Sequence, residues 1–369
     1  MPGDLPRAVS LYLDLVRFLA AMCVFITHAK YNRFTNGWLD SAGRYGSDAV
    51  MIFFVLSGLV IAHVTQEKER NFESYAIARL ARLWSVALPA LLLSLVADSI
   101  GRQLYPPIYD GSWFQGEQAA LRLLVNAMFQ GQSWFANFLP FTNTPYWSLG
   151  YEFWYYALFA AGHFLRGPAR WGTLALCCAL CGPKILLLLP IWLLGVGVYR
   201  FAQTRQIPVQ AGWLLWIGSF VGYGLYQALG IPGYLLWRTT QWFGAPFVID
   251  QLLWSKDFVG NYVVGLLVAT NFMGFWRICG TFHALLLRFQ LPIQFLAGFT
   301  FSVYLFHMPF LHFFAAMVRH DAANPISQAF ILLATLAGIF LLGLFTEQKK
   351  TLVRGWISVS VHSFIRRPT

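Results

Sequence analysis

Charged residues are scarce in this sequence. Only 11% of its 369 residues are Asp, Glu, Lys or Arg, whereas 58% are hydrophobic and 18% are aromatic. About a quarter of the residues of a typical soluble domain are charged, and such a domain does not need so large an apolar share. The composition therefore excludes an ordinary water-soluble globular protein.

Cysteine is also rare, and several common functional motifs are missing. The five cysteines are three within an apolar stretch (Cys177, Cys178 and Cys181) and two isolated residues (Cys23 and Cys279), so we expect small buried side chains and no disulfide framework. The sequence lacks metal-ligand spacing, a Gly-rich phosphate loop, repeats and low-complexity tracts. We therefore expect no metal, no permanently bound cofactor and no nucleic-acid partner.

Long hydrophobic stretches dominate what remains. Segments of about 17–25 apolar residues, the length that a helix needs to cross a bilayer, recur along the whole chain. They predict an all-α polytopic membrane protein with about ten transmembrane helices, at residues 11–29, 49–65, 83–101, 146–164, 171–188, 190–204, 211–229, 257–275, 293–316 and 327–346. The boundary before the sixth helix is placed at Pro190. The more polar stretch 121–141 is interpreted as an interfacial or re-entrant piece. We expect the first stretch to be a retained helix instead of a cleaved signal peptide, and residues 1–369 to form one transmembrane domain with no fused soluble domain.

The distribution of basic residues predicts the orientation. With ten spans both termini lie on one side of the membrane, and that side carries 17 of the 26 basic residues. The positive-inside rule then places both termini in the cytoplasm. Topology and contact with anionic lipids explain most of this excess, and binding of a phosphate-bearing donor would be an additional role.

The first predicted helix carries ionisable residues on one face. Arg17 and His28 are eleven positions apart, which is about 20° past three full helical turns and about 16 Å along the axis. Asp14 lies about 40° from His28 on the same stripe. An ionisable residue in a membrane helix costs several kcal/mol unless it faces protein or water, so it marks a candidate functional site.

Four further segments combine polar and aromatic residues. They are "GSDAVMIFFVLSG" at 46–58, "RLARLWSVALP" at 79–89, "YWSLGYEFWYY" at 146–156 and "FSVYLFHMPF" at 301–310. The predicted topology places His28 and Glu152 at a similar depth near the outer side. Arg17, Arg79 and Arg82 lie nearer the cytosol, and guanidinium groups suit the binding of phosphate. A histidine, whose usual pKa is near neutral, suits the removal of a proton from a hydroxyl.

Together these segments resemble the acyltransferase 3 family, which comprises integral-membrane acyltransferases of bacterial glycans. An Arg followed eleven residues later by a His is similar to the hallmark of its first helix, and "FFVLSG", "WSLGYEFWYY", "SVYLFH" and the Arg-x-x-Arg of "RLARLWSVALP" resemble four more of its motifs in the same order. The sequence departs from the family in two places. Members commonly have two consecutive acids after Trp-Ser-Leu, whereas only Glu152 is present here, and Ser85 stands where members often have Pro.

The resemblance implies a multi-pass enzyme of the bacterial inner membrane that transfers an acyl group other than an amino-acyl group. The expected donor is acetyl-CoA or another acyl-CoA, which Arg79 and Arg82 would bind. The expected acceptor is a hydroxyl of a carbohydrate or lipid-linked glycan. His28 would be the general base or would carry the acyl group covalently. Arg17 would steady the donor or the oxyanion, and Glu152 would orient the imidazole or hold the acceptor.

Other interpretations of the same residues stay open. Arg17, His28 and Glu152 could form the relay of a proton-coupled transporter or flippase. Arg79 and Arg82 could be ordinary positive-inside residues, and Ser57 and Gly58 could be small residues at a close helix contact. His307 could be a hydrogen-bonded core histidine. The sequence alone names neither the acceptor nor the oligomeric state.

Overall fold

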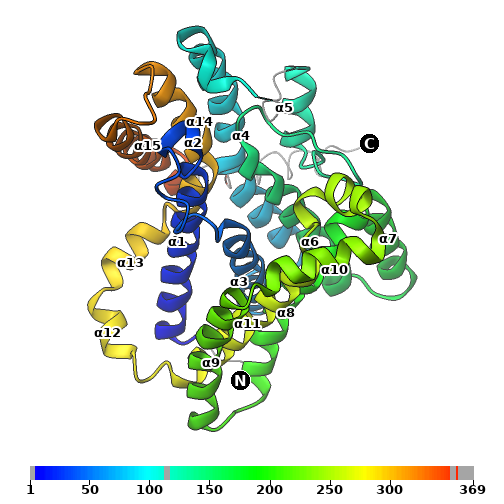
Figure 1. The fold of residues 1–369 in the computed structure, drawn as a ribbon. Coiled ribbons are helices and arrows are strands. Elements are labelled where there is room, and N and C mark those ends of the chain that lie inside the picture. Colours follow the sequence, from blue (N-terminus) through cyan, green and yellow to red (C-terminus); the bar gives the residue numbers. More distant parts are fainter. Residues whose placement is uncertain (1–4, 112–116, 350–354, 356–369) are drawn as a thin grey trace.

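The computed structural model describes residues 5–111, 117–349 and 355, and in these residues the regular elements are helices (Figure 1). The helices are α1 (Arg7–Ala29), α2 (Asn32–Thr35), α3 (Gly46–Glu67), α4 (Phe72–Leu104), α5 (Ala119–Ala127), α6 (Trp147–Phe164), α7 (Gly167–Cys181), α8 (Pro183–Thr204), α9 (Val209–Ala228), α10 (Ile231–Phe243), α11 (Phe258–Ile278), α12 (His283–Arg288), α13 (Gln290–Ala297), α14 (Thr300–Met317) and α15 (Pro325–Phe345). Short turns include η1 (Pro106–Tyr109), η2 (Thr144–Tyr146) and η5 (Glu347–Lys349).

Seven of the described helices are long and apolar enough to cross a membrane, namely α1, α3, α4, α8, α11, α14 and α15. The pair α9 and α10 together would make an eighth span, bent by 63° at the break between them. The all-helical, multi-pass character is thus confirmed, whereas the count of ten is not. One predicted span that is not confirmed corresponds to α7. The 15 residues of α7 extend only about 22 Å, which is less than the thickness of the hydrocarbon core.

Two predicted helix boundaries were wrong. The helix expected at 171–188 is interrupted at Gly182, while α8 continues through Pro190 as far as Thr204. Gly182 has a φ of +81°, and a Cβ atom there would lie 2.6 Å from the Cα atom of Trp134. The positive φ and this backbone contact end α7. A proline inside α8 is tolerated because neighbouring groups can satisfy the backbone of a membrane helix.

The predicted helix 293–316 is also divided. Its first five residues belong to α13, which ends at Ala297, and α14 begins at Thr300. The stretch 121–141 contains the short helix α5 and irregular chain, and no spanning helix, as expected. The predicted location of the termini concerns residues 1–4 and 356–369, which lie outside the described residues, so it stays a prediction.

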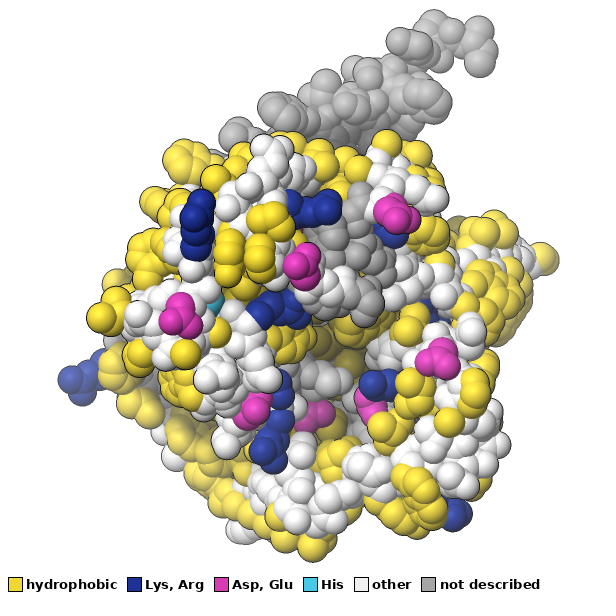
Figure 2. Space-filling view, turned by 45° about the horizontal axis from the view of Figure 1, so that its top comes forward, with side chains coloured by type: hydrophobic (Ala, Val, Ile, Leu, Met, Phe, Trp, Pro, Cys, Tyr) yellow, Lys and Arg dark blue, Asp and Glu magenta, His cyan; other side chains and the backbone are white. Residues whose placement is uncertain are grey.

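The centre of the bundle is formed by α3 and α14. α3 packs against α1, α8 and α11, and α14 packs against α1, α4 and α15. Large apolar side chains remain exposed on the outer helices, for example Leu333, Leu341 and Phe345 of α15, as expected where helices meet lipid. Figure 2 shows the upper face of Figure 1 tilted forward, with charged side chains gathered around a hollow near its middle and apolar ones around them.

The contact between α3 and α8 depends on two glycines. A Cβ atom on Gly58 would lie 2.0 Å from the carbonyl oxygen of Trp192, and one on Gly195 would lie 1.8 Å from the carbonyl oxygen of Val55. The two backbones therefore touch directly, as small residues allow in membrane helix pairs. This explains the Gly of the "FFVLSG" segment.

We expect Gly195→Ala to destabilise the protein by about 1–3 kcal/mol, because the added methyl group must push two helix backbones apart. Gly197→Ala is the matched control, since its Cβ atom would meet no heavy atom within 4 Å, and alanine favours the helix. Thermal unfolding in detergent measures both variants. Equal melting temperatures for the two would contradict the close contact.

Candidate active site

A cavity of about 340 Å³ lies among α1, α3, α4, α6 and the N-terminal end of α14. Four of the five predicted site residues border it: Arg17, Arg79, Arg82 and Glu152. They come from three different helices and span 136 positions of the sequence. His28, the fifth, is not part of its lining. The fold thus gathers the predicted arginines and the predicted acid around one space.

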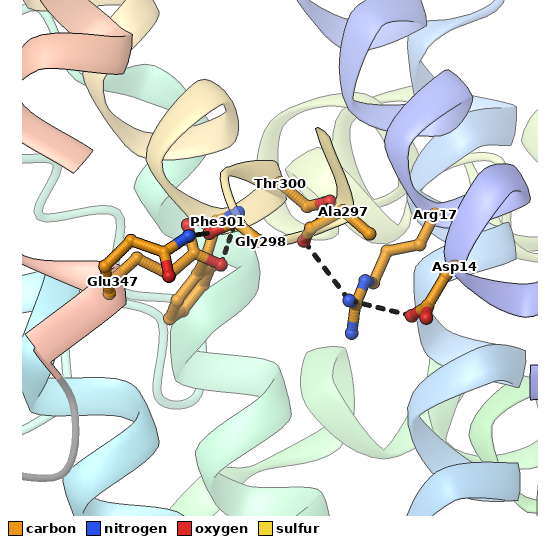
Figure 3. Close-up of polar contacts among 8 residues, drawn as sticks. Asp14, Arg17, Ala297, Gly298, Thr300, Phe301 and Glu347 are labelled. Atoms are coloured by element: carbon orange, nitrogen blue, oxygen red, sulfur yellow. Dashed lines mark hydrogen bonds and ion pairs between the residues drawn. The ribbon is translucent and has the colours of Figure 1, made fainter. Parts of the chain in front are cut away.

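Arg17 extends from α1 to the turn between α13 and α14 (Figure 3). Its Nη2 atom donates to Asp14 Oδ1 at 3.0 Å and to the carbonyl oxygen of Ala297 at 3.2 Å. Its buried Nε atom has no hydrogen-bond partner among the described residues. Asp14 balances the charge of Arg17 as its spacing in the sequence suggested, and the break after α13 supplies the second acceptor.

Glu347 holds the opposite side of the same turn (Figure 3). Its carboxylate accepts hydrogen bonds from the backbone N–H groups of Phe301 at 3.3 Å and Ser302 at 2.9 Å, and from the Ser302 hydroxyl at 3.0 Å. It therefore caps the N-terminal end of α14, where the helix dipole favours a negative charge. Burial raises the pKa of Glu347 above its usual value, while these hydrogen bonds and Arg17 oppose the rise. No motif or hydrophobic pattern pointed to this residue, because it follows the last hydrophobic stretch.

The two arginines of α4 differ in their partners. Arg79 donates from Nη2 to Glu69 Oε1 at 2.5 Å, but its buried Nε and Nη1 atoms have no partner among the described residues. The side chain of Arg82 makes no ion pair in the described part of the chain, and it borders the same cavity as Glu152 and Glu347. Arg82 therefore brings to the cavity a guanidinium group that has no ion-pair partner among the described residues.

Glu152 connects two of the sequence segments. Its Oε1 atom accepts hydrogen bonds from the Ser57 hydroxyl at 3.1 Å and from the Tyr156 hydroxyl. Ser57 also accepts a hydrogen bond from Trp192 Nε1 at 3.2 Å. Ser57 is thus more than a small packing residue, because it binds the acid that borders the cavity. Its position follows from the close contact of α3 with α8.

His28 contacts a histidine and not the predicted acid. Its Nδ1 atom lies 2.9 Å from the carbonyl oxygen of Val24 and 3.0 Å from Nε2 of His307. The expectation that Glu152 orients this imidazole does not match these contacts. His307 lies one helical turn beyond Tyr304, which borders the cavity and shares a hydrogen bond of 2.8 Å with Ser148. α14 therefore carries one residue that contacts His28 and another that borders the cavity.

Comparison with known proteins identifies the family of this chain. Residues 10–344 match the sequence profile of a family described as an acyltransferase domain. The chain belongs to the acyltransferase 3 family. The match covers most of the chain and includes every motif named above, so the predicted family, and with it the predicted enzyme class, is confirmed.

A curated relative supports the same assignment. The acyltransferase MdmB of Streptomyces mycarofaciens is 29% identical over 274 residues, which are 70% of this chain and 66% of that protein. The match thus spans just under two thirds of the relative's length. No solved structure matches the chain.

We expect the cavity to be accessible to small reagents. Ser85 borders it, so Ser85→Cys should react with a small thiol reagent, and acetyl-CoA should protect it. Ser94 of the same helix is fully buried with its hydroxyl bonded to the carbonyl oxygen of Ala90 at 2.7 Å, so Ser94→Cys is the unreactive control. Mass spectrometry of the labelled peptides reads out both. Equal labelling, or labelling that acetyl-CoA leaves unchanged, would argue against a donor cavity here.

Proposed function

We propose that this protein transfers an acyl group, with acetyl as the expected one, from acyl-CoA to a hydroxyl of a carbohydrate or lipid-linked glycan at the bacterial inner membrane. The observation that carries the proposal is the cavity that unites Arg17, Arg79, Arg82 and Glu152. Membership of an acyltransferase family supports the reaction class. The donor, the acceptor and the roles of individual residues are part of the proposal.

The arginines support an anionic donor. Coenzyme A carries phosphate groups, and guanidinium groups bind phosphate through charge-assisted hydrogen bonds. Arg82 has no ion-pair partner among the described residues, and Arg79 keeps two unpartnered nitrogen atoms. A volume of about 340 Å³ lies at the low end of the range for small-molecule pockets, which is about 300–1,000 Å³. Such a cavity suits the narrow acyl-pantetheine arm of the donor better than its nucleotide.

In this mechanism His28 removes the proton of the acceptor hydroxyl as its oxygen attacks the thioester carbonyl. The carbon–sulfur bond breaks, and the thiolate of coenzyme A leaves and takes up the proton that His28 removed, which returns the imidazole to its neutral form. Arg17 holds the donor, because it lies too far from His28 to reach an oxyanion that forms there. Arg17 and His28 are separated by about 16 Å along α1, a distance that an extended acyl-pantetheine arm bridges while its phosphates stay with the arginines. An acyl-His28 intermediate is the variant in which donor and acceptor react in turn.

The contacts favour this function over transport. A proton relay through Arg17, His28 and Glu152 needs hydrogen bonds that connect them. The acid is bonded to Ser57 and Tyr156, and the imidazole to His307 and Val24. Arg17 is bonded to Asp14 and Ala297, so the described contacts form three separate groups. The arrangement fits a donor site and a base better than a continuous relay.

We expect His28→Ala to bind acyl-CoA with normal affinity and to lose transfer, because general base catalysis contributes roughly 10²–10⁴-fold to such a rate. Donor binding is measured by calorimetry, and transfer by thiol release from acetyl-CoA in membranes supplied with acceptor. Retained transfer in this variant would exclude both the base and the acyl-His28 mechanism.

We expect Arg79→Gln and Arg82→Gln each to raise the KM for acyl-CoA roughly tenfold or more, since a hydrogen bond to a charged group contributes about 1.5–3 kcal/mol. Arg70→Gln is the matched control, because Arg70 is exposed, does not border the cavity and bonds only the Gln66 carbonyl oxygen in the described structure. Similar KM values for all three variants would show that the α4 arginines serve topology alone.

A further inference from the structure

The most direct contact of the proposed base is a second histidine from the other end of the sequence. Nε2 of His307 lies 3.0 Å from Nδ1 of His28, and the two residues are 279 positions apart. His307 is fully buried, whereas His28 is partly exposed. No carboxylate pairs with either ring in the described part of the chain.

Backbone carbonyl groups determine which nitrogen atoms carry the protons. Nδ1 of His307 lies 2.8 Å from the carbonyl oxygen of Val303, and a carbonyl can only accept a hydrogen bond. The neutral ring of His307 therefore carries its proton on Nδ1 and presents a lone pair at Nε2. Nδ1 of His28 faces two acceptors, this lone pair and the carbonyl oxygen of Val24 at 2.9 Å. His28 must then carry its proton on Nδ1.

We propose that His307 is a positioning residue that holds His28 with its Nε2 atom unprotonated and free to accept the proton of the acceptor hydroxyl. The inference rests on the proposed function, because it concerns the base of that reaction. Nε2 of His28 has no hydrogen-bond partner among the described residues, and it is not one of the fully buried polar atoms. The nitrogen that the reaction needs is the one that the contacts leave available.

The surrounding rings restrict the movement of both imidazoles. Phe25 of α1 meets the ring of His307 edge-on, with centroids 6.1 Å apart, and Tyr31 meets the ring of His28 edge-on at 5.7 Å. The Val24 carbonyl is already the acceptor of the helical N–H group of His28, so it is a shared partner. The lone pair on Nε2 of His307 receives no other donor in the described contacts. It therefore orients the ring of His28 more strongly than the shared Val24 carbonyl does.

A neutral partner suits this location. In serine proteases a carboxylate orients the catalytic histidine and stabilises the imidazolium. A carboxylate buried among membrane helices would add a costly charge during the whole cycle. The pair of neutral imidazoles has no net charge at rest, and its hydrogen bond becomes charge-assisted only when His28 gains a proton. His307 cannot pass that proton on, because its other nitrogen faces the Val303 carbonyl.

Two amide variants at position 307 test the contact. A glutamine places its amide near the position of Nε2, where its oxygen can accept from His28, whereas an asparagine places it near Nδ1 and falls short. We expect His307→Gln to retain most of kcat and His307→Asn to lose at least about tenfold, both with an unchanged KM for acyl-CoA. The control is His312→Asn, because His312 is equally buried on α14 and makes the same bond to the carbonyl four residues earlier. We expect its kcat to stay near that of the wild type.

The second measurement does not depend on activity. In the full-length protein with ¹⁵N-labelled histidine in nanodiscs, NMR should show His28 protonated at Nδ1 and coupled through the hydrogen bond to Nε2 of His307. Protonation at Nε2 of His28, or equal kcat in the Gln and Asn variants, would overturn the inference. Absence of acyl transfer from acyl-CoA by the wild-type protein would instead overturn the proposed function, so the two failures are distinguishable.

Discussion

A charged side chain in a membrane-spanning helix must receive polar partners from elsewhere in the protein. An arginine at the centre of such a helix costs about 2.5–3.5 kcal/mol even in favourable cases. Arg17 meets this requirement with Asp14 on its own helix and with the carbonyl oxygen of Ala297, 280 positions later. That carbonyl is available because the chain is broken between α13 and α14. The position of Arg17 and the irregular turn therefore depend on each other.

The same turn organises the rest of the cavity. Glu347 caps the first turn of α14, which fixes the start of the helix that carries both Tyr304 and His307. Tyr304 borders the cavity, and His307 bonds the ring of His28. One helix thus links the end of the site where the arginines gather to the end where the proposed base lies. Arg82 has no ion-pair partner among the described residues, but the acids Glu152 and Glu347 border the same cavity.

The close packing of α3 against α8 positions another polar residue of the cavity, Ser57. Gly58 and Gly195 let α3 and α8 approach until their backbones touch, and this places Ser57 between Trp192 and Glu152. The motif of the second predicted helix and the motif of the fourth meet at this point. In this short segment Gly58 allows the close helix contact. That contact brings Ser57 within hydrogen-bonding distance of its partners.

The sequence by itself determined the helical, multi-pass character, the family and most of the residues around the cavity, because hydrophobic runs and local motifs encode helices and their faces. It could not place the break at Gly182 instead of Pro190, since that break follows from a positive φ and a contact with Trp134. Only the tertiary structure decided that Glu152 bonds Ser57 and that His28 bonds His307. Such pairs depend on how helices far apart in the chain rotate and cross, which is set by packing over the whole bundle and leaves no local pattern in the sequence.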